Sequence, residues 1–259
     1  MDEIFLLQSD QRAAVTLVGA LDPPHRVRVV ETFSELEALL QETEAQGCIL
    51  DIFDSPSSIP LTSLRRLRRR HPTLALIIAS DFSGKEMELY HLGRLSVDGV
   101  IRIEDQASSR DILSVVNNAL AASLATLVVR NTAPDLAPIA QDAIRWVIEH
   151  AESRPQVSEL AAALAMSPRV FLREMKTLDL VSPRTLLLWG RLIRASNLLE
   201  RPSETVESVA FHFGYATGGA LGKALKRHVG CSPTELLERG GLNWTLKVFQ
   251  RQGLRHGNG

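Results

Sequence analysis

Two periodicities of apolar residues alternate along the first half of the chain. Short apolar runs of strand length are separated by stretches in which apolar residues recur every three or four positions, as on an amphipathic helix. The runs predict strands over 4–7, 27–30, 48–53, 74–79 and 97–103, and the stretches predict helices over 11–21, 34–45, 61–70 and 108–120. Ser34 is the expected cap of the second helix. This alternation predicts an α/β domain over 1–122, with a five-stranded parallel sheet covered on both faces.

Every pattern beyond residue 138 is helical. Helices are predicted over 139–150, 157–164, 168–178, 183–199, 206–213, 219–229 and 233–238. Serines at cap positions (Ser158, Ser167, Ser182, Ser232) and prolines at first helical positions (Pro168, Pro183, Pro233) mark the starts. These elements predict an all-α domain over 139–239.

Two further segments lie outside these domains. Alanines mixed with the turn residues Asn131-Thr132-Ala133-Pro134 interrupt the periodicity, so we expect a linker over 123–138. Residues 240–259 are expected to form a tail, in which one amphipathic fragment over 244–249 precedes a frayed end.

The formal net charge of −1 conceals an asymmetry between the two halves. Residues 1–136 carry 13 basic and 19 acidic side chains, and the rest of the chain carries 16 basic and 11 acidic ones. A basic second half is typical of a regulator with one DNA-facing domain.

Several function classes find no support in the composition. We expect no membrane span, because no apolar run reaches the roughly 20 residues that a span needs, and the acidic start is unlike a secretory signal. The expected location is therefore the cytoplasm. Cys48 and Cys231 are the only cysteines, and the histidines show no ligand spacing, so no disulfide, metal or cofactor is expected.

The helical half contains a diverged internal repeat. The first copy comprises Leu160-Ala161, Leu164, Ser167, Phe171, Met175-Lys176 and Ser182-Pro183, and the second comprises Val209-Ala210, Phe213-Gly214, Ala216, Leu221, Leu225-Lys226 and Ser232-Pro233. The offset changes from about 49 to about 50 residues, which one residue inserted in the turn explains. Each copy has a short apolar helix, a tight turn and a longer helix with basic outer positions, the pattern of a helix-turn-helix unit.

These residues resemble the AraC-type transcriptional regulators over roughly 139–237. The most specific matches are Pro183, Leu186, Arg191-Leu192, Ala195 and Leu198-Leu199, which resemble that family's long central helix, followed by Gly214-Tyr215 and Ser232-Pro233. The resemblance implies a sequence-specific, DNA-binding transcriptional regulator whose two recognition helices, 168–176 and 219–227, lie in successive major grooves. It also implies double-stranded DNA and RNA polymerase as partners.

The two recognition helices are expected to differ in role. In the first, capped by Ser167, the inward positions include Phe171, Leu172 and Met175, while Arg169, Arg173 and Lys176 project outward, where arginine can read guanine. A solvated helix face is the alternative interpretation. In the second, Gly218, Gly219, Ala220 and Gly222 offer little to a base edge. It is expected to bind phosphate through Lys223, Lys226, Arg227, Gly219 and the helix N-terminus near Thr217.

The first domain resembles the receiver domain of two-component response regulators. Asp51 and Ser80 end two strands where a receiver carries its phosphoacceptor and its hydroxyl residue. Only Asp10 stands where an acidic pair should hold magnesium, and Ile103, next to Arg102, replaces the lysine. We therefore expect a degenerate receiver used for homodimerisation or signal input, with Asp51 as a strand-end residue and Asp54 as an alternative exposed carboxylate. An active phosphoacceptor at Asp51 is the alternative interpretation.

Three alternatives complete the hypotheses. The arginine run over 65–70 suggests a second nucleic-acid site, but the spacing of Leu61, Leu64 and Leu67 favours a helix with an inward apolar stripe and solvated arginines. A non-DNA-binding protein that sequesters a partner would also fit the glycine-rich helix. DNA-repair alkyl acceptors with an AraC-like module need a cysteine cluster that this chain lacks, so an enzyme is not expected.

Overall fold

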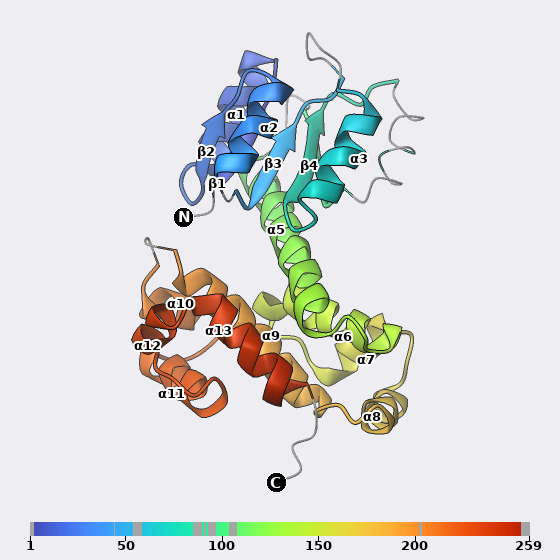
Figure 1. The fold of residues 1–259 in the computed structure, drawn as a ribbon, viewed down its shortest axis with the longest axis vertical. Coiled ribbons are helices and arrows are strands. Elements are labelled where there is room, and N and C mark those ends of the chain that lie inside the picture. The colour runs from blue at the N-terminus through green and yellow to red at the C-terminus, as the bar shows by residue number, and fades with distance from the viewer. Residues whose placement is uncertain are drawn as a thin grey trace. The chain divides into compact units, whose positions relative to one another are not determined.

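The computed structural model describes residues 3–43, 45–53, 59–84, 90, 92, 97–103, 108–201 and 204–254. The chain divides into two compact units, Met1–Leu124 and Ala125–Gly259. Figure 1 shows a sheet flanked by helices in the first unit and only helices in the second.

The first unit contains the predicted parallel sheet. Its elements are β1 (Glu3–Leu7), α1 (Gln11–Leu21), β2 (Arg26–Val29), α2 (Phe33–Glu42), β3 (Gly47–Leu50), α3 (Leu61–Arg70), β4 (Ala75–Ser80), β5 (Gly99–Arg102) and α5 (Ser109–Thr132). The strand order is β2-β1-β3-β4-β5, and every neighbouring pair is parallel. This is the order of flavodoxin-like doubly wound sheets, to which receiver domains belong. The predicted fold class is therefore confirmed.

Helices cover both faces of this sheet because alternate strand residues point to opposite sides. On one face, Phe5, Cys48 and Leu76 pack with residues of α2 and α3. On the other, Ile4 and Ile77 pack with residues of α1 and α5. The central strands are buried on both sides, which explains why their sequences read as continuous apolar runs.

The cap of α2 differs from the expectation. Thr32, not Ser34, precedes the helix, and its hydroxyl accepts a hydrogen bond from the Glu35 amide at 3.1 Å. Thr32 has extended backbone geometry, which a cap requires, whereas Ser34 already lies inside the first turn.

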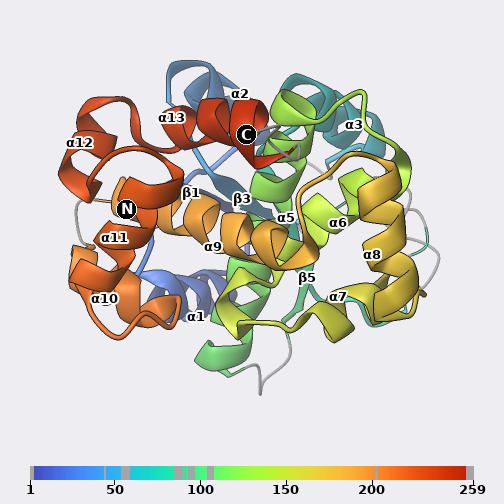
Figure 2. The ribbon, with the colours of Figure 1, turned by 90° about the horizontal axis from the view of Figure 1, so that it is seen from below.

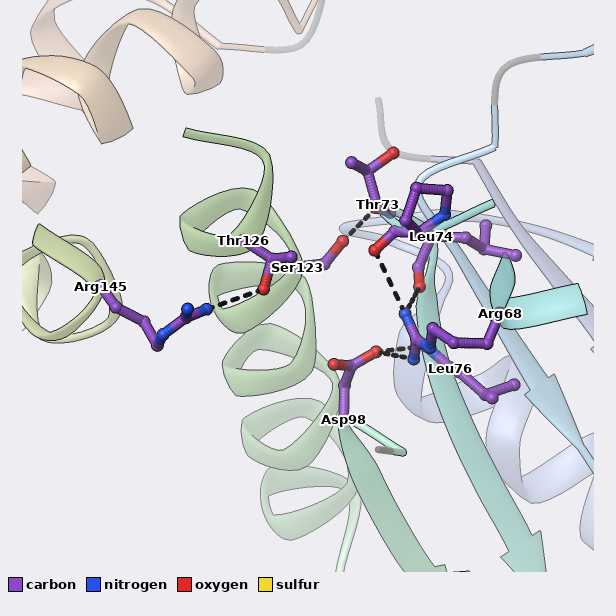
Figure 3. Close-up of polar contacts among 9 residues, drawn as sticks. Arg68, Thr73, Leu74, Leu76, Asp98, Ser123, Thr126 and Arg145 are labelled. Carbon is purple, nitrogen blue, oxygen red and sulfur yellow. Dashed lines mark hydrogen bonds and ion pairs between the residues drawn. The ribbon is translucent and has the colours of Figure 1, made fainter. Parts of the chain in front are cut away.

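The arginine run of α3 is solvated only in part. Leu64 and Leu67 are buried as predicted, and Arg66 pairs with Glu37 at 3.2 Å. Arg68, in contrast, forms a close ion pair with Asp98 and donates a hydrogen bond to the Leu74 carbonyl at 2.9 Å (Figure 3). Arg68 therefore joins α3 to the segments that flank β4, and the expectation that all these arginines are solvated was wrong.

Helix α5 overturns the linker prediction over 123–138. The helix continues to Thr132, with Leu124, Val128 and Val129 buried. Leu124 and Val128 are four residues apart, so the apolar positions stay on one face although alanines surround them. The turn predicted near residue 131 is present, because the helix ends at Thr132.

The same helix corrects the expectation that no segment has the length of a membrane span. Ser109–Thr132 is long and apolar enough by length and composition, with a mean hydropathy of 1.9. Yet 56% of that window is buried inside the protein, and Val116 and Ala119 pack against the sheet. A core helix meets the same criteria.

The second unit is helical as predicted. Its elements are α6 (Pro138–Glu149), the 3-10 turn η1 (Ala151–Ser153), α7 (Val157–Ala163), α8 (Pro168–Thr177), α9 (Pro183–Leu199), α10 (Val206–His212), α11 (Gly218–His228), α12 (Pro233–Glu238), α13 (Gly241–Val248) and the π-helical turn η2 (Phe249–Gly253). Ser167, Ser182 and Ser232 cap their helices as expected. Ser158 does not cap α7. The cap is Gln156, whose backbone N–H donates to the Glu159 carboxylate at 2.6 Å.

The predicted frayed tail is largely ordered. Helix α13 packs along α9, where the Ser196 and Thr245 hydroxyls form a buried hydrogen bond of 2.8 Å. The Phe249 ring lies 5.3 Å from that of Trp189. Past the helix, the Leu254 carbonyl accepts a hydrogen bond from the Val181 amide at 3.1 Å. The tail therefore completes the core of the unit.

Candidate nucleic-acid interface

Helices α7 and α8 form one helix-turn-helix, and α10 and α11 form the other. The two turns close in the same way, since the Met166 amide donates to the Ala161 carbonyl at 2.9 Å and the Tyr215 amide donates to Ala210 at 2.8 Å. Each turn passes through a left-handed residue, Ala165 with φ 55° and Gly214 with φ 75°. The duplication predicted from the sequence thus reappears in the hydrogen bonds of both turns.

Helix α9 lies between the two helix-turn-helix motifs. Figure 2 shows α8 and α11 on opposite sides of α9. Gly190 brings α9 close to α6, because a Cβ at this position would lie 2.4 Å from the Val147 carbonyl oxygen. The recognition helices are therefore held by a tightly packed central helix.

An ion-pair network joins η1, which precedes α7, to α9 and to α10 of the second helix-turn-helix. Glu152 of η1 pairs with Arg194, which is 5% exposed on α9, and its other carboxylate oxygen lies 3.1 Å from His212 Nε2 on α10. Burial acts to raise the pKa of Glu152, but the His212 hydrogen bond and the Arg194 charge outweigh it and lower this pKa to about 2. Glu152 therefore stays ionised and couples η1 and α10 to α9.

Helix α8 presents a continuous outer stripe. Its inward positions are Phe171 and Met175, which are buried. The outer positions are Arg169, Leu172, Arg173 and Lys176, which are all exposed and fall within about one quarter to one third of the helix circumference. The Ser167 hydroxyl caps the helix by accepting from the Val170 amide at 3.4 Å. The sequence-predicted cations of α8 thus share one accessible face.

Leu172 was wrongly placed among the inward positions. It is 54% exposed and lies beside Arg169 and Lys176, its neighbours at three and four residues. Adjacency to Phe171 in the sequence suggested burial, although consecutive helical residues point about 100° apart. An exposed leucine between cations can contact the methyl group of thymine, a role that residue type alone did not reveal.

Helix α11 repeats this geometry at an offset of 50 residues, with different side chains. Leu221 and Leu225 occupy the inward positions, and Thr217 caps the helix by accepting from the Ala220 amide at 3.1 Å. The outer stripe is Gly219, Gly222, Lys223 and Lys226, where α8 has Arg169, Leu172, Arg173 and Lys176. Arg227 is exposed beside this stripe. The first two positions of the stripe, Gly219 and Gly222, therefore carry no side chain.

Packing does not require Gly219 or Gly222. A Cβ at Gly219 would lie 3.7 Å from the Thr217 hydroxyl, and one at Gly222 would lie 3.6 Å from Pro233. Both are ordinary van der Waals distances. In contrast to Gly190, both positions would therefore accept a methyl group without displacing a neighbour.

The N-terminus of α11 is less available to phosphate than the sequence suggested. The Gly218 amide already donates to the Glu207 carboxylate at 2.7 Å, and the Ala220 amide already donates to Thr217. Glu207 also places a negative charge where a phosphate would approach. These two amides already have acceptors, which disfavours the expected contacts between backbone amides and phosphate. The side chains of Lys223, Lys226 and Arg227 are accessible.

The second candidate site lies at the carboxyl end of the sheet, around Asp51. This carboxylate is 2% exposed and accepts hydrogen bonds from Ser80 at 2.7 Å, from Ser9 at 3.2 Å and from the Phe53 amide at 3.1 Å. Asp51 is thus satisfied by hydroxyl and amide groups from the ends of three neighbouring strands. Asp54, the alternative carboxylate, lies outside the described residues.

The groups that would support a phosphorylated Asp51 are engaged elsewhere. The Asp10 carboxylate caps α1 by accepting from the Arg12 amide at 2.8 Å. Ile103 packs into the core, and Arg102, the register partner of Ser80, is exposed. That the receiver is degenerate stays a prediction.

Comparison with known proteins agrees with the sequence resemblance of the second unit. Residues 160–239 match a family of helix-turn-helix domains. The HTH-type transcriptional activator RhaS of Escherichia fergusonii is 24% identical over 142 residues, which are 53% of this chain and 51% of that protein. The chain therefore spans about half the length of this curated relative. The resemblance of the C-terminal part to AraC-type helix-turn-helix proteins is confirmed.

Solved structures similar to parts of the chain include members of both classes. A DNA-binding transcriptional dual regulator from Escherichia coli K-12 is 21% identical, with a TM-score of 0.37 over 40% of this chain and 94% of that one. A response-regulator receiver domain from Bacteroides fragilis is 14% identical, with a TM-score of 0.40 over 46% of this chain and 97% of that one.

Proposed function

We propose that this protein is a sequence-specific, DNA-binding transcriptional regulator that reads bases mainly through α8. The observation that carries the proposal is the outer stripe of α8, where an accessible leucine, two arginines and a lysine share one face. Such a stripe suits the major groove, which admits an α-helix and presents guanine acceptors and thymine methyl groups. The similarity of this region to a helix-turn-helix activator supports the same conclusion.

In this proposal α11 anchors the protein to the DNA backbone. Its stripe has lysines only in its second half, and the glycines before them reach no base edge. Lysine acts on phosphate as a point charge with little sequence preference. Specificity should therefore reside in one helix, and much of the salt-dependent affinity in the other.

The test compares the wild type with Arg173→Ala. Bound duplexes are first selected from a random library, and affinities for the selected and a random duplex are then measured. Arg173→Ala should weaken specific binding by about 1–3 kcal/mol and relax base preference at one position. Arg184→Ala, an exposed arginine on α9, is the matched control. Equal losses on both duplexes would contradict base reading by Arg173, and no retention of the wild type on DNA would favour a protein-sequestering role.

The first unit is proposed to act as a receiver-like module without phosphorylation, in homodimerisation or signal input. Asp51 is buried and hydrogen bonded, Asp10 caps a helix, and Ile103 provides no cation. A transferred phosphoryl group would add about two negative charges with little to compensate them.

A further inference from the structure

A second positively charged feature lies where the end of the helix-turn-helix region meets the C-terminal tail. It is a pocket of about 270 Å³ formed by the C-terminal end of α11, the end of α12, and α13 with η2. Its lining includes Arg227, His228, Arg239, Trp244, Lys247 and Arg251. Two of the four full charges, Lys247 and Arg251, lie in the tail, outside residues 160–239, which match the helix-turn-helix family.

The charge of this pocket is poorly compensated from within. The described residues that line it include no aspartate or glutamate. Among the residues that the structure describes, neither Arg227, Arg239, Lys247 nor Arg251 forms an ion pair within 4.0 Å. Glu235 of α12 lies near enough to Arg239 for their charges to interact, but it does not line the pocket. Four like charges around one concavity favour the binding of an anion.

The walls of the pocket are fixed by packing. The Arg239 guanidinium lies 5.1 Å from the centroid of the Trp244 ring, and the Trp244 indole N–H donates to the Val229 carbonyl at 3.4 Å. The Trp189 ring, whose centroid is 6.3 Å from that of His228, packs edge-on against the His228 ring. Burial and the charge of Arg227 lower the pKa of His228, which favours the neutral form of its ring.

We propose that this pocket binds a small phosphorylated ligand. Its concave shape, with cations on several elements, suits a compact polyanion, because arginine and lysine from different directions can each meet a phosphate oxygen. A DNA backbone phosphate carries the same chemistry, but duplex DNA would have to reach cations that surround a concavity. The ligand would bind independently of the recognition stripe of α8.

The probe is inorganic pyrophosphate, titrated calorimetrically into the full chain at constant ionic strength. The test variant is Lys247→Gln with Arg251→Gln, which removes two exposed cations and leaves the Arg239 and Trp244 contact in place. The control variant is Arg110→Gln with Arg130→Gln, which removes the same charge from exposed positions on α5. Wild type and control should bind alike, and the test variant should bind at least about tenfold more weakly with an unchanged Tm.

Two results would overturn the proposal. One is the absence of pyrophosphate binding by the wild type, or binding that the test variant retains in full. The other adds to the absence of pyrophosphate binding a change in DNA binding. If the test variant lowers the slope of log affinity against log salt for duplex DNA by about two, these cations contact the DNA backbone instead. Loss of DNA binding by Arg173→Ala would not bear on the pyrophosphate result, because Arg173 does not line the pocket.

Discussion

Replacing Gly222 by alanine should stabilise the protein, although the residue lies on a proposed DNA-binding helix. Gly222 occupies the interior of α11, where glycine is less favourable than alanine by about 0.8–1.0 kcal/mol. The new Cβ would meet Pro233 at 3.6 Å, so it adds contact without overlap. We expect the free energy of unfolding to rise by about 0.5–1 kcal/mol, measured by urea denaturation followed by far-UV circular dichroism.

The same substitution at Gly190 serves as the opposite control. There a Cβ would lie 2.4 Å from a backbone oxygen of Val147, which cannot move without separating α6 from α9. Gly190→Ala should therefore destabilise the unit by about 1–3 kcal/mol or more. If Gly222→Ala also destabilised the protein, the inference that a methyl group fits beside Pro233 would be wrong.

The DNA affinity of Gly222→Ala separates two roles for the glycines. If α11 contacts DNA only through its lysines, an extra methyl group should leave affinity within about twofold. A loss of tenfold or more, with raised stability, would show that the helix backbone itself approaches DNA closely and would refute the proposed division between α8 and α11.

Three further predictions follow from the same geometry. Lys226→Ala should weaken binding to all duplexes equally and flatten the salt dependence by about one unit, and a loss confined to one sequence would contradict a phosphate contact. Asp51→Asn should leave DNA affinity and oligomeric state unchanged, and acetyl phosphate with magnesium should not label the protein, whereas stoichiometric labelling lost in Asp51→Asn would show an active phosphoacceptor. Glu152→Gln should lower stability at pH 7 by about 1–2 kcal/mol, because its pKa of about 2 lies below the ordinary 4.5 and the partial exposure of the carboxylate weakens the effect. The stabilisation by Glu152 is complete above pH 4.5 and is lost as the pH falls towards 2, so the difference between wild type and variant should shrink in acid, and a constant difference would exclude this linkage.

The element order and the duplication were predictable because both depend on local periodicity. Helices over 11–21, 61–70, 183–199 and 233–238 coincide with the predicted ranges. The equivalence of Phe171 with Leu221 also followed from spacing, whereas Ser167 was paired with Ala216 and corresponds in the structure to the cap Thr217. These features need only the repeat of a helix and the hydrogen bonding of a cap.

The remaining features depend on partners distant in sequence. Arg68 pairs with Asp98 across 30 residues, and Glu207 accepts from Gly218 across a turn, so no local pattern announces either contact. The linker was mispredicted because the alanines around Leu124 and Val128 hide an apolar face that only tertiary packing reveals. Leu172 illustrates the reverse, since an apolar residue was assumed to be buried although its helix position points outward.

The course of the C-terminal segment has a practical consequence for handling the protein. The segment begins near Glu200, which accepts a hydrogen bond from the Leu242 amide at 2.8 Å, and runs along α9 to Leu254, which packs beside Met175 of α8 and Leu186 of α9. A chain shortened at residue 239, the last residue of the matched family region, would lose the contacts of this segment with α8 and α9 and would expose Trp189. Fragments meant to retain the DNA-binding half should therefore extend through Leu254, and affinity tags should be attached at the other end of the chain.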